Sequence, residues 1–74
     1  MSKERANDLA RICTGAVRAG ADFQIVWHTL LNGHPLVAGI PQERIEGERR
    51  LLDIPLITGE RLVFDGDTKT FDLE

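Results

Sequence analysis

DFQIVWHTLLNGHP, residues 22–35, is the stretch that decides the fold. Its apolar side chains recur at the i, i+3, i+4, i+7 and i+8 spacing of one helical face: Phe23, Val26, Trp27, Leu30 and Leu31. The aspartate at its start can cap the first turn, and the Asn32-Gly33 pair followed by a proline supplies the stop. The stretch predicts a helix over about residues 22–32 that packs this face against a sheet.

Upstream of this stretch, residues 3–19 show the same helical periodicity. Their apolar members fall within one arc of the helix: Ala6, Leu9, Ala10, Cys13, Ala16 and Val17. The opposite side mixes acidic and basic residues, which is typical of a solvated face. Gly20 lies where this helix should end, and very few residues separate it from the next one. The sequence therefore predicts an N-terminal helical hairpin.

Downstream of Pro35 the apolar period changes from 3.6 to about 2, and glycine or proline recurs every few residues. This pattern predicts an antiparallel β-meander of three to five strands. The expected strands span about residues 36–40, 49–57, 61–65 and 69–73, and a turn is expected at Ile45 to Glu48, before the second strand. The predicted fold class is α+β, with the helical hairpin packed on one face of the meander.

The size and composition of the chain favour one folded domain over residues 1–74. A length of 74 residues lies near the lower limit at which one hydrophobic core can stabilise a fold without a disulfide, a metal ion or an oligomeric partner. The 42% of apolar and 28% of charged residues are ordinary for a globular protein. The single cysteine cannot form an internal disulfide, no leader-like segment is apparent, and the apolar runs are far shorter than a membrane span. We expect a cytoplasmic protein that does not enter membranes.

The charge distribution argues against nucleic acid as a partner. The formal net charge is -3, and the acidic residues are concentrated at the C-terminal end. The last ten residues hold four acidic residues, Asp65, Asp67, Asp72 and Glu74, and one basic residue, Lys69. Non-specific nucleic-acid binding depends on neutralising phosphates with basic side chains, and no basic surplus is present. Nucleic-acid binding is therefore the least favoured function.

No motif in the chain predicts a catalytic, cofactor or metal site. His28 and His34 are six residues apart, whereas two histidines that share a metal on a helix are four apart. Cys13 falls on the apolar face of its helix, where a thiol behaves as a small hydrophobe. The Asp65-to-Lys69 segment lacks the later oxygen ligands of a calcium loop, and its residues are those of a tight turn.

Two features predict a contact surface outside the core. Ile25 points about 160° away from the apolar face of its helix and lies beside His28. The strand predicted over residues 49–57 has apolar groups on both faces, although the helices can cover only one, and its Pro55 belongs at an edge or a bulge. The candidate interface residues are Ile25, His28, Arg49, Leu51 and Ile57.

These observations favour a small non-enzymatic protein-interaction module, namely a regulator, inhibitor or adaptor, that acts as a homodimer. The alternative is a small ligand-binding or enzymatic subunit. Its weak site candidates are His34, Glu48 and Arg50, near one edge of the sheet. A pocket is difficult to enclose in so small a monomer, so such a site would have to form between subunits.

Overall fold

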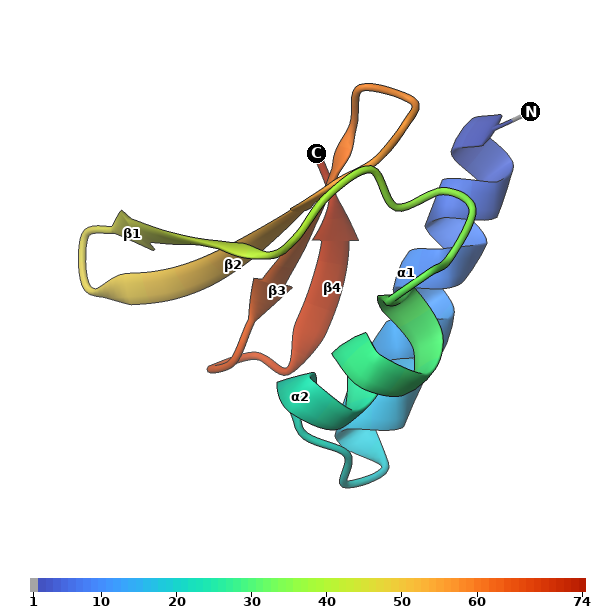
Figure 1. Cartoon of the computed structure of the whole chain (residues 1–74). Coiled ribbons are helices and arrows are strands. Elements are labelled where there is room, and N and C mark those ends of the chain that lie inside the picture. The colour runs from blue at the N-terminus through green and yellow to red at the C-terminus, as the bar shows by residue number, and fades with distance from the viewer. Residues whose placement is uncertain (1) are drawn as a thin grey trace.

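The computed structural model describes residues 2–74 of the chain. A long helix precedes a short helical segment and four strands, so the predicted α+β class is confirmed (Figure 1). In chain order the elements are α1 (Ser2–Arg18), α2 (Phe23–Val26), η1 (Trp27–Leu31), β1 (Gln42–Glu46), β2 (Arg49–Pro55), β3 (Arg61–Asp65) and β4 (Thr70–Leu73). Within this described range, no helix combines the length and the apolar character that crossing a membrane requires.

The four strands form one antiparallel sheet in the order β1-β2-β3-β4, which confirms the predicted meander. Ile54 pairs with Leu62, and Phe64 pairs with Phe71. Because side chains alternate between the two faces of a strand, this register places all four on one face of the sheet. We call it the inner face, since it packs against α1, and we call the opposite face the outer face.

The helix α1 builds the core by packing against β4 on the inner face (Figure 1). The apolar arc predicted for this helix is the side that becomes buried. Its buried residues are Ala6, Leu9, Ala10, Cys13 and Val17. Three of these side chains are small, those of Ala6, Ala10 and Cys13, so the helix can approach the sheet closely. Large aliphatic groups of β2 and β3, Ile54 and Leu62, fill the space beneath it and are fully buried.

A hydrogen bond ties α1 directly to the backbone of β4. The Thr14 hydroxyl donates to the carbonyl of Ala10 at 2.8 Å and accepts from the backbone N–H of Phe71 at 2.8 Å. Since β4 is the last strand of the sheet, this N–H has no strand partner on its outward side. The threonine therefore satisfies a donor that the end of the sheet would otherwise leave unpaired.

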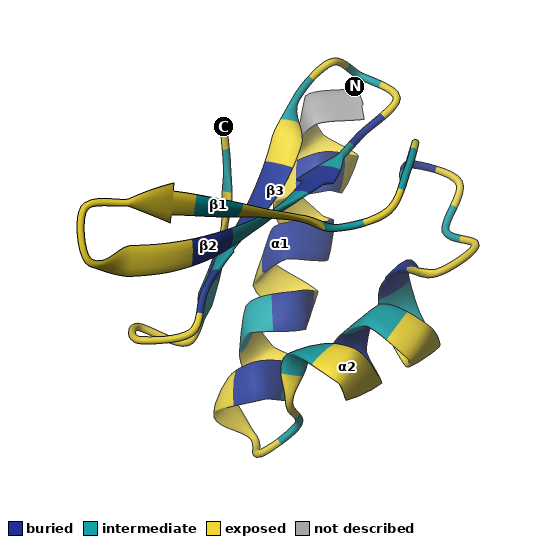
Figure 2. Cartoon of the chain, turned by 60° about the vertical axis from the view of Figure 1, so that its left-hand side comes forward, coloured by how far each residue is buried: buried dark blue, intermediate teal, exposed yellow. Residues whose placement is uncertain are grey.

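The predicted helical hairpin is wrong. Only α1 is a long helix, and the second helix is the four-residue α2 continued by the single π-helical turn η1. Figure 2 shows this short segment leading obliquely away from the end of α1 rather than running back along it. The wide turn brings Leu31 into the core, while Phe23, Trp27 and Leu30 are only partly buried. A strict 3.6-residue period could not predict this change of pitch.

The signals at the ends of the short helical segment act as predicted. Asp22 caps α2, with its Oδ1 accepting from the backbone N–H of Ile25 at 3.0 Å. Gly20 and Gly33 lie before and after the segment with φ values of 117° and 84°, where glycine is strongly favoured. The sequence therefore predicted the limits of this segment better than its internal geometry.

The strand expected at residues 36–40 is also wrong. This segment makes only an isolated bridge from Val37 to Leu56, and the strand that pairs with β2 is β1, which the sequence had suggested only as part of a turn. Between the bridge and β1 the chain bulges past Pro55, the last residue of β2, where a Cβ on Gly39 would lie 3.0 Å from the proline ring. Proline thus ends the regular ladder, as its missing N–H requires.

Removing the centre of the core should lower stability strongly. We expect Ile54→Ala to reduce the free energy of unfolding by about 2 to 5 kcal/mol, because its fully buried side chain would leave a cavity under α1. Urea unfolding followed by Trp27 fluorescence measures this change. The matched control is Ile57→Ala, which removes an exposed isoleucine and should change the free energy by less than about 0.5 kcal/mol. Equal effects of the two variants would contradict the described core.

The bond from α1 to β4 can be tested with an isosteric change. Thr14→Val should cost about 1 to 3 kcal/mol of unfolding free energy, because the Phe71 N–H would lose its acceptor. Thr29→Val is the matched control, since Thr29 makes the same bond to a carbonyl four residues earlier, at 2.6 Å, but is exposed and holds no strand. Thermal or urea unfolding of both variants would show the difference, and a Thr14 effect no larger than that of Thr29 would refute the role of this bond.

Candidate functional site

The β1–β2 hairpin extends beyond the helices and leaves part of the inner face uncovered. Figure 2 shows both strands projecting from the body of the molecule, with exposed residues at the far end of the hairpin. The long helix α1 packs on β4, at the edge of the sheet opposite β1. The core ends there in three aromatic rings: Phe23 lies 5.1 Å from Phe64 and 6.1 Å from Phe71, measured between ring centroids.

Two adjoining hollows lie on this uncovered inner face and share Leu52. One, of about 420 Å³, lies along the hairpin next to Phe64, and the other, of about 400 Å³, is lined by Trp27 and Ile40. We call the pair the hairpin hollow. Its apolar lining residues are half-buried or exposed, and Ile40 is one of the most exposed large hydrophobic residues in the structure. The hairpin hollow is therefore an apolar surface at the limit of the core.

Charged side chains at the rim of the hairpin hollow are largely acidic. Glu43, Glu48 and Asp67 lie around it with one basic residue, Arg50. The Nε of Arg50 donates to the Oε2 of Glu43 at 3.0 Å, so the guanidinium is engaged within the hairpin. Such a rim is typical of the polar border around an apolar protein–protein contact. It offers little positive charge for binding a phosphate or a carboxylate.

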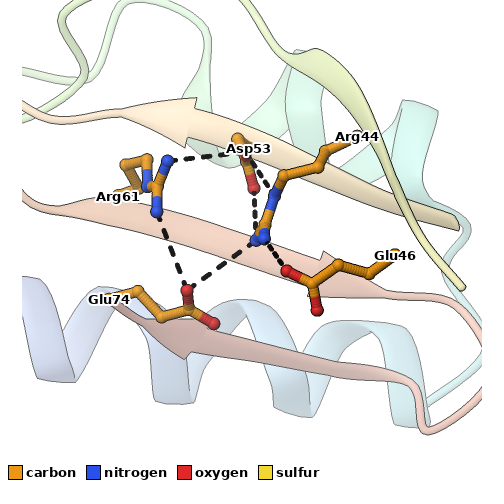
Figure 3. Close-up of polar contacts among 5 residues, drawn as sticks. All are labelled: Arg44, Glu46, Asp53, Arg61 and Glu74. Carbon is orange, nitrogen blue, oxygen red and sulfur yellow. Dashed lines mark hydrogen bonds and ion pairs between the residues drawn. The ribbon is translucent and has the colours of Figure 1, made fainter. Parts of the chain in front are cut away.

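The outer face of the sheet carries a network of ion pairs centred on Arg44 (Figure 3). Its guanidinium donates to both carboxylate oxygens of Asp53, at 2.9 and 3.2 Å, and also pairs with Glu46. The hydrogen bond to Asp53 is the main reason that the pKa of Arg44 is raised above its ordinary value. Arg61 extends the network, with nitrogens 3.8 Å from Asp53 and from Glu74. All four strands or their ends contribute to this cluster.

The network encloses two apolar residues on the outer face. Leu51 is 5% exposed and Val63 is 4% exposed, although no helix covers this side of the sheet in the described residues. Leu51 lies opposite Arg44 and opposite Asp65, the partner of Arg49 in an ion pair. The charged side chains surround Leu51 from neighbouring strands, so the apolar group is screened by their stems. The prediction that Leu51 belongs to a contact surface outside the core is wrong, because its side chain is buried within one copy of the chain.

The other candidate interface residues lie on separate parts of the surface. Ile25 and His28 are exposed on the helical segment, and His28 also borders the hairpin hollow near Trp27. Ile57 is exposed in the turn after β2. Arg49 is exposed at the start of β2. These residues therefore do not form one continuous patch.

The three weak ligand-site candidates are not brought together. Glu48 and Arg50 lie along the hairpin hollow, whereas His34 lines a different hollow beside Arg5 and Leu9 of α1. The Nδ1 of His34 accepts from the backbone N–H of Leu36 at 3.1 Å. The side chain helps to shape the loop between η1 and β1.

The reactive groups of the described chain are not arranged as a chemical site. No cluster of three or more histidine, cysteine, aspartate or glutamate side chains among residues 2–74 is placed to hold a metal ion. Cys13 is fully buried, and desolvation raises the pKa of its thiol to about 11. The thiol is therefore protonated at neutral pH and is a poor nucleophile.

The hairpin hollow was not found by sequence reasoning. The segment Ile45 to Glu48 was assigned to a turn, because its glycine and charges are typical of turns. The alternation of Glu43, Arg44, Ile45 and Glu46 was the available signal, since alternating apolar and charged residues before a glycine also predict a strand leading into a hairpin. Ile45 is exposed on the inner face of that strand.

Comparisons with known proteins found no similarity to this chain: no family model, no curated protein and no solved structure matches it. The functional argument therefore depends on the geometry of the chain itself.

Burial of Cys13 predicts a specific pH dependence of stability. The thiol has a pKa of about 11 in the folded protein against 9.0 as the ordinary value, so above pH 9 it ionises more readily in the unfolded chain. Its contribution to the free energy of unfolding is fully present below pH 9 and should be lost as the pH rises toward 11. Urea unfolding of the protein and of Cys13→Ala across this range measures the difference. The wild-type curve should fall more steeply, and parallel curves would contradict a buried neutral thiol.

Proposed function

We propose that this chain is a non-enzymatic protein-interaction module, a regulator, inhibitor or adaptor, that acts as a homodimer. The observation that supports this proposal is the hairpin hollow, an apolar surface that the helices leave uncovered. Its members Trp27, Leu52 and Phe64 are half-buried and Ile40 is exposed, and Ile45, which lies outside the hollow on the same face of the sheet, is exposed as well. Aromatic and large aliphatic groups at the edge of a core are suited to burial against another protein chain.

The charges around the hairpin hollow favour binding over catalysis. Arg50 is paired with Glu43, and on the outer face Arg44 and Arg61 are paired with Asp53. Groups engaged in this way stabilise the sheet and are not poised as acids, bases or nucleophiles. The acidic rim also repels phosphate groups, which disfavours nucleic acid as the partner.

The small size of the fold favours self-association. A 74-residue chain buries only part of its apolar surface in its own core, and here one long helix covers a sheet of four strands. A second copy could bury apolar groups that this arrangement leaves exposed. Dimerisation would add to stability by mass action.

Sedimentation velocity tests the homodimer. We expect the weight-average mass of the intact chain to rise from the monomer value of 8.3 kDa toward twice that value as the concentration increases through the micromolar range. The physical reason is that association removes exposed apolar groups, such as Ile40 and Ile45, from water. Dilution of the same sample should restore the monomer, which controls for irreversible aggregation. A mass that stays at the monomer value over the whole range would overturn the homodimer.

A further inference from the structure

We propose that β1 pairs with β1 of a second copy in an antiparallel ladder whose two-fold axis passes through Ile45, so that two sheets join edge to edge. This inference deepens the homodimer proposed above and depends on it. The partner is a second copy of this chain.

The two edge strands differ in how they are covered. At β4 the Thr14 hydroxyl of α1 takes up the outward N–H of Phe71, and the Nε of Arg18 donates to the carbonyl of Lys69 at 3.4 Å, so the helix occupies this side. At β1 no helix or strand among residues 2–74 lies along the outer edge, and the strand is at the open side of the hairpin (Figure 1). Only β1 therefore offers an edge to another chain.

The hairpin geometry determines which backbone groups of β1 face outward. Glu46 pairs with Arg49 across the two-residue turn of Gly47 and Glu48, and Gly47 has a φ of 62° at the first turn position. The pair that closes such a turn uses its N–H and C=O groups within the hairpin, and in an antiparallel ladder these groups alternate in direction along the strand. The outward groups are therefore those of Glu43 and Ile45. Two copies centred on Ile45 can exchange the two N–H to C=O bonds of Ile45 itself, and Glu43 then faces the partner's Gly47.

The charges of β1 select this register. When Ile45 lies opposite the partner's Ile45, Arg44 lies opposite the partner's Glu46, and by symmetry the same pair forms a second time. Opposite charges in directly facing positions stabilise a ladder. Both residues lie on the outer face, so the pairs would extend the ion network that already links Arg44 with Asp53.

Neighbouring registers are penalised by the same charges. Moving the axis one residue toward the N-terminus places Arg44 opposite the partner's Arg44, and moving it one residue toward the turn places Glu46 opposite the partner's Glu46. Like charges that face each other directly destabilise a pair of strands. The alternating signs on β1 thus disfavour misaligned copies while they match the aligned one.

Ile45 supplies the apolar centre of the contact. It is 64% exposed, although edge strands that avoid pairing usually carry a charge at such a position. In the proposed dimer the two isoleucines meet on the inner face beside Arg50, which is opposite Ile45 in the hairpin. One short strand per copy makes a small interface, so we expect a micromolar dissociation constant.

Cysteine cross-linking tests the position of the axis. In Ile45→Cys the two new thiols would lie on directly opposed residues about 5.5 Å apart at Cα, within the range of a disulfide, so mild oxidation should give a covalent dimer. Cys13 can stay in place, since it is buried and its thiol is protonated. The matched control is Ile57→Cys, because Ile57 is 63% exposed but lies outside β1, and it should stay largely monomeric. Equal cross-linking of both variants would overturn the inference.

Charge reversal tests the register without a cross-link. Glu46→Arg would place arginine opposite Arg44 twice, and we expect the dissociation constant from sedimentation to rise by about tenfold or more. Asp72→Arg makes the same change of net charge on β4, at the opposite edge of the sheet, where Asp72 is exposed and far from the proposed ladder, and should alter it less than about twofold.

The outcomes separate the two proposals. A wild-type dimer that neither cross-links at position 45 nor distinguishes Glu46→Arg from Asp72→Arg would overturn the β1 contact and leave the homodimer standing. A wild-type chain that remains monomeric would overturn both. A cross-link at position 45 together with selective weakening by Glu46→Arg supports the proposed ladder.

Discussion

The packing of α1 against β4 is the contact on which the rest of the structure depends. It buries the small apolar side of the helix on the inner face, and the Thr14 hydroxyl satisfies the outward N–H of Phe71. Because α1 is the only long helix in the described chain, it covers the β4 side of the sheet and leaves the β1 side open. The position of every exposed apolar group on the hairpin follows from this unequal coverage.

The two faces of the open half of the sheet differ in how their apolar residues are covered. On the outer face Leu51 and Val63 are covered by the side chains of ion pairs, so the surface exposed to water there is charged. On the inner face the ion pair of Glu43 with Arg50 leaves Leu52 half-buried and Ile45 exposed, and the hairpin hollow lies beside them. Individual exposed ion pairs contribute little to stability, but here their aliphatic stems also shield apolar groups from water. The hairpin therefore presents a charged outer face and an inner face on which exposed apolar groups lie among charged ones.

Parts of the fold could be predicted from the chain because they depend on local chemistry. Asp22 caps the second helical segment, the apolar arc of α1 is buried, and β3 covers the predicted residues. The candidate site was harder to predict. The isoleucine of β1 was assigned to a turn, and Leu51 was expected on an open face, because the ion pairs that enclose it join residues from different strands.

The sequence by itself determined the fold class, the limits of the helices through caps and glycines, and the burial of Cys13, since each depends on neighbours within a few residues. Only the tertiary structure decided which apolar groups stay in contact with water. That outcome depends on the length of α1 relative to the width of the sheet, on the π-helical turn at Trp27–Leu31, and on ion pairs between strands. These are distances between segments far apart in the chain, and periodicity along the chain does not contain them.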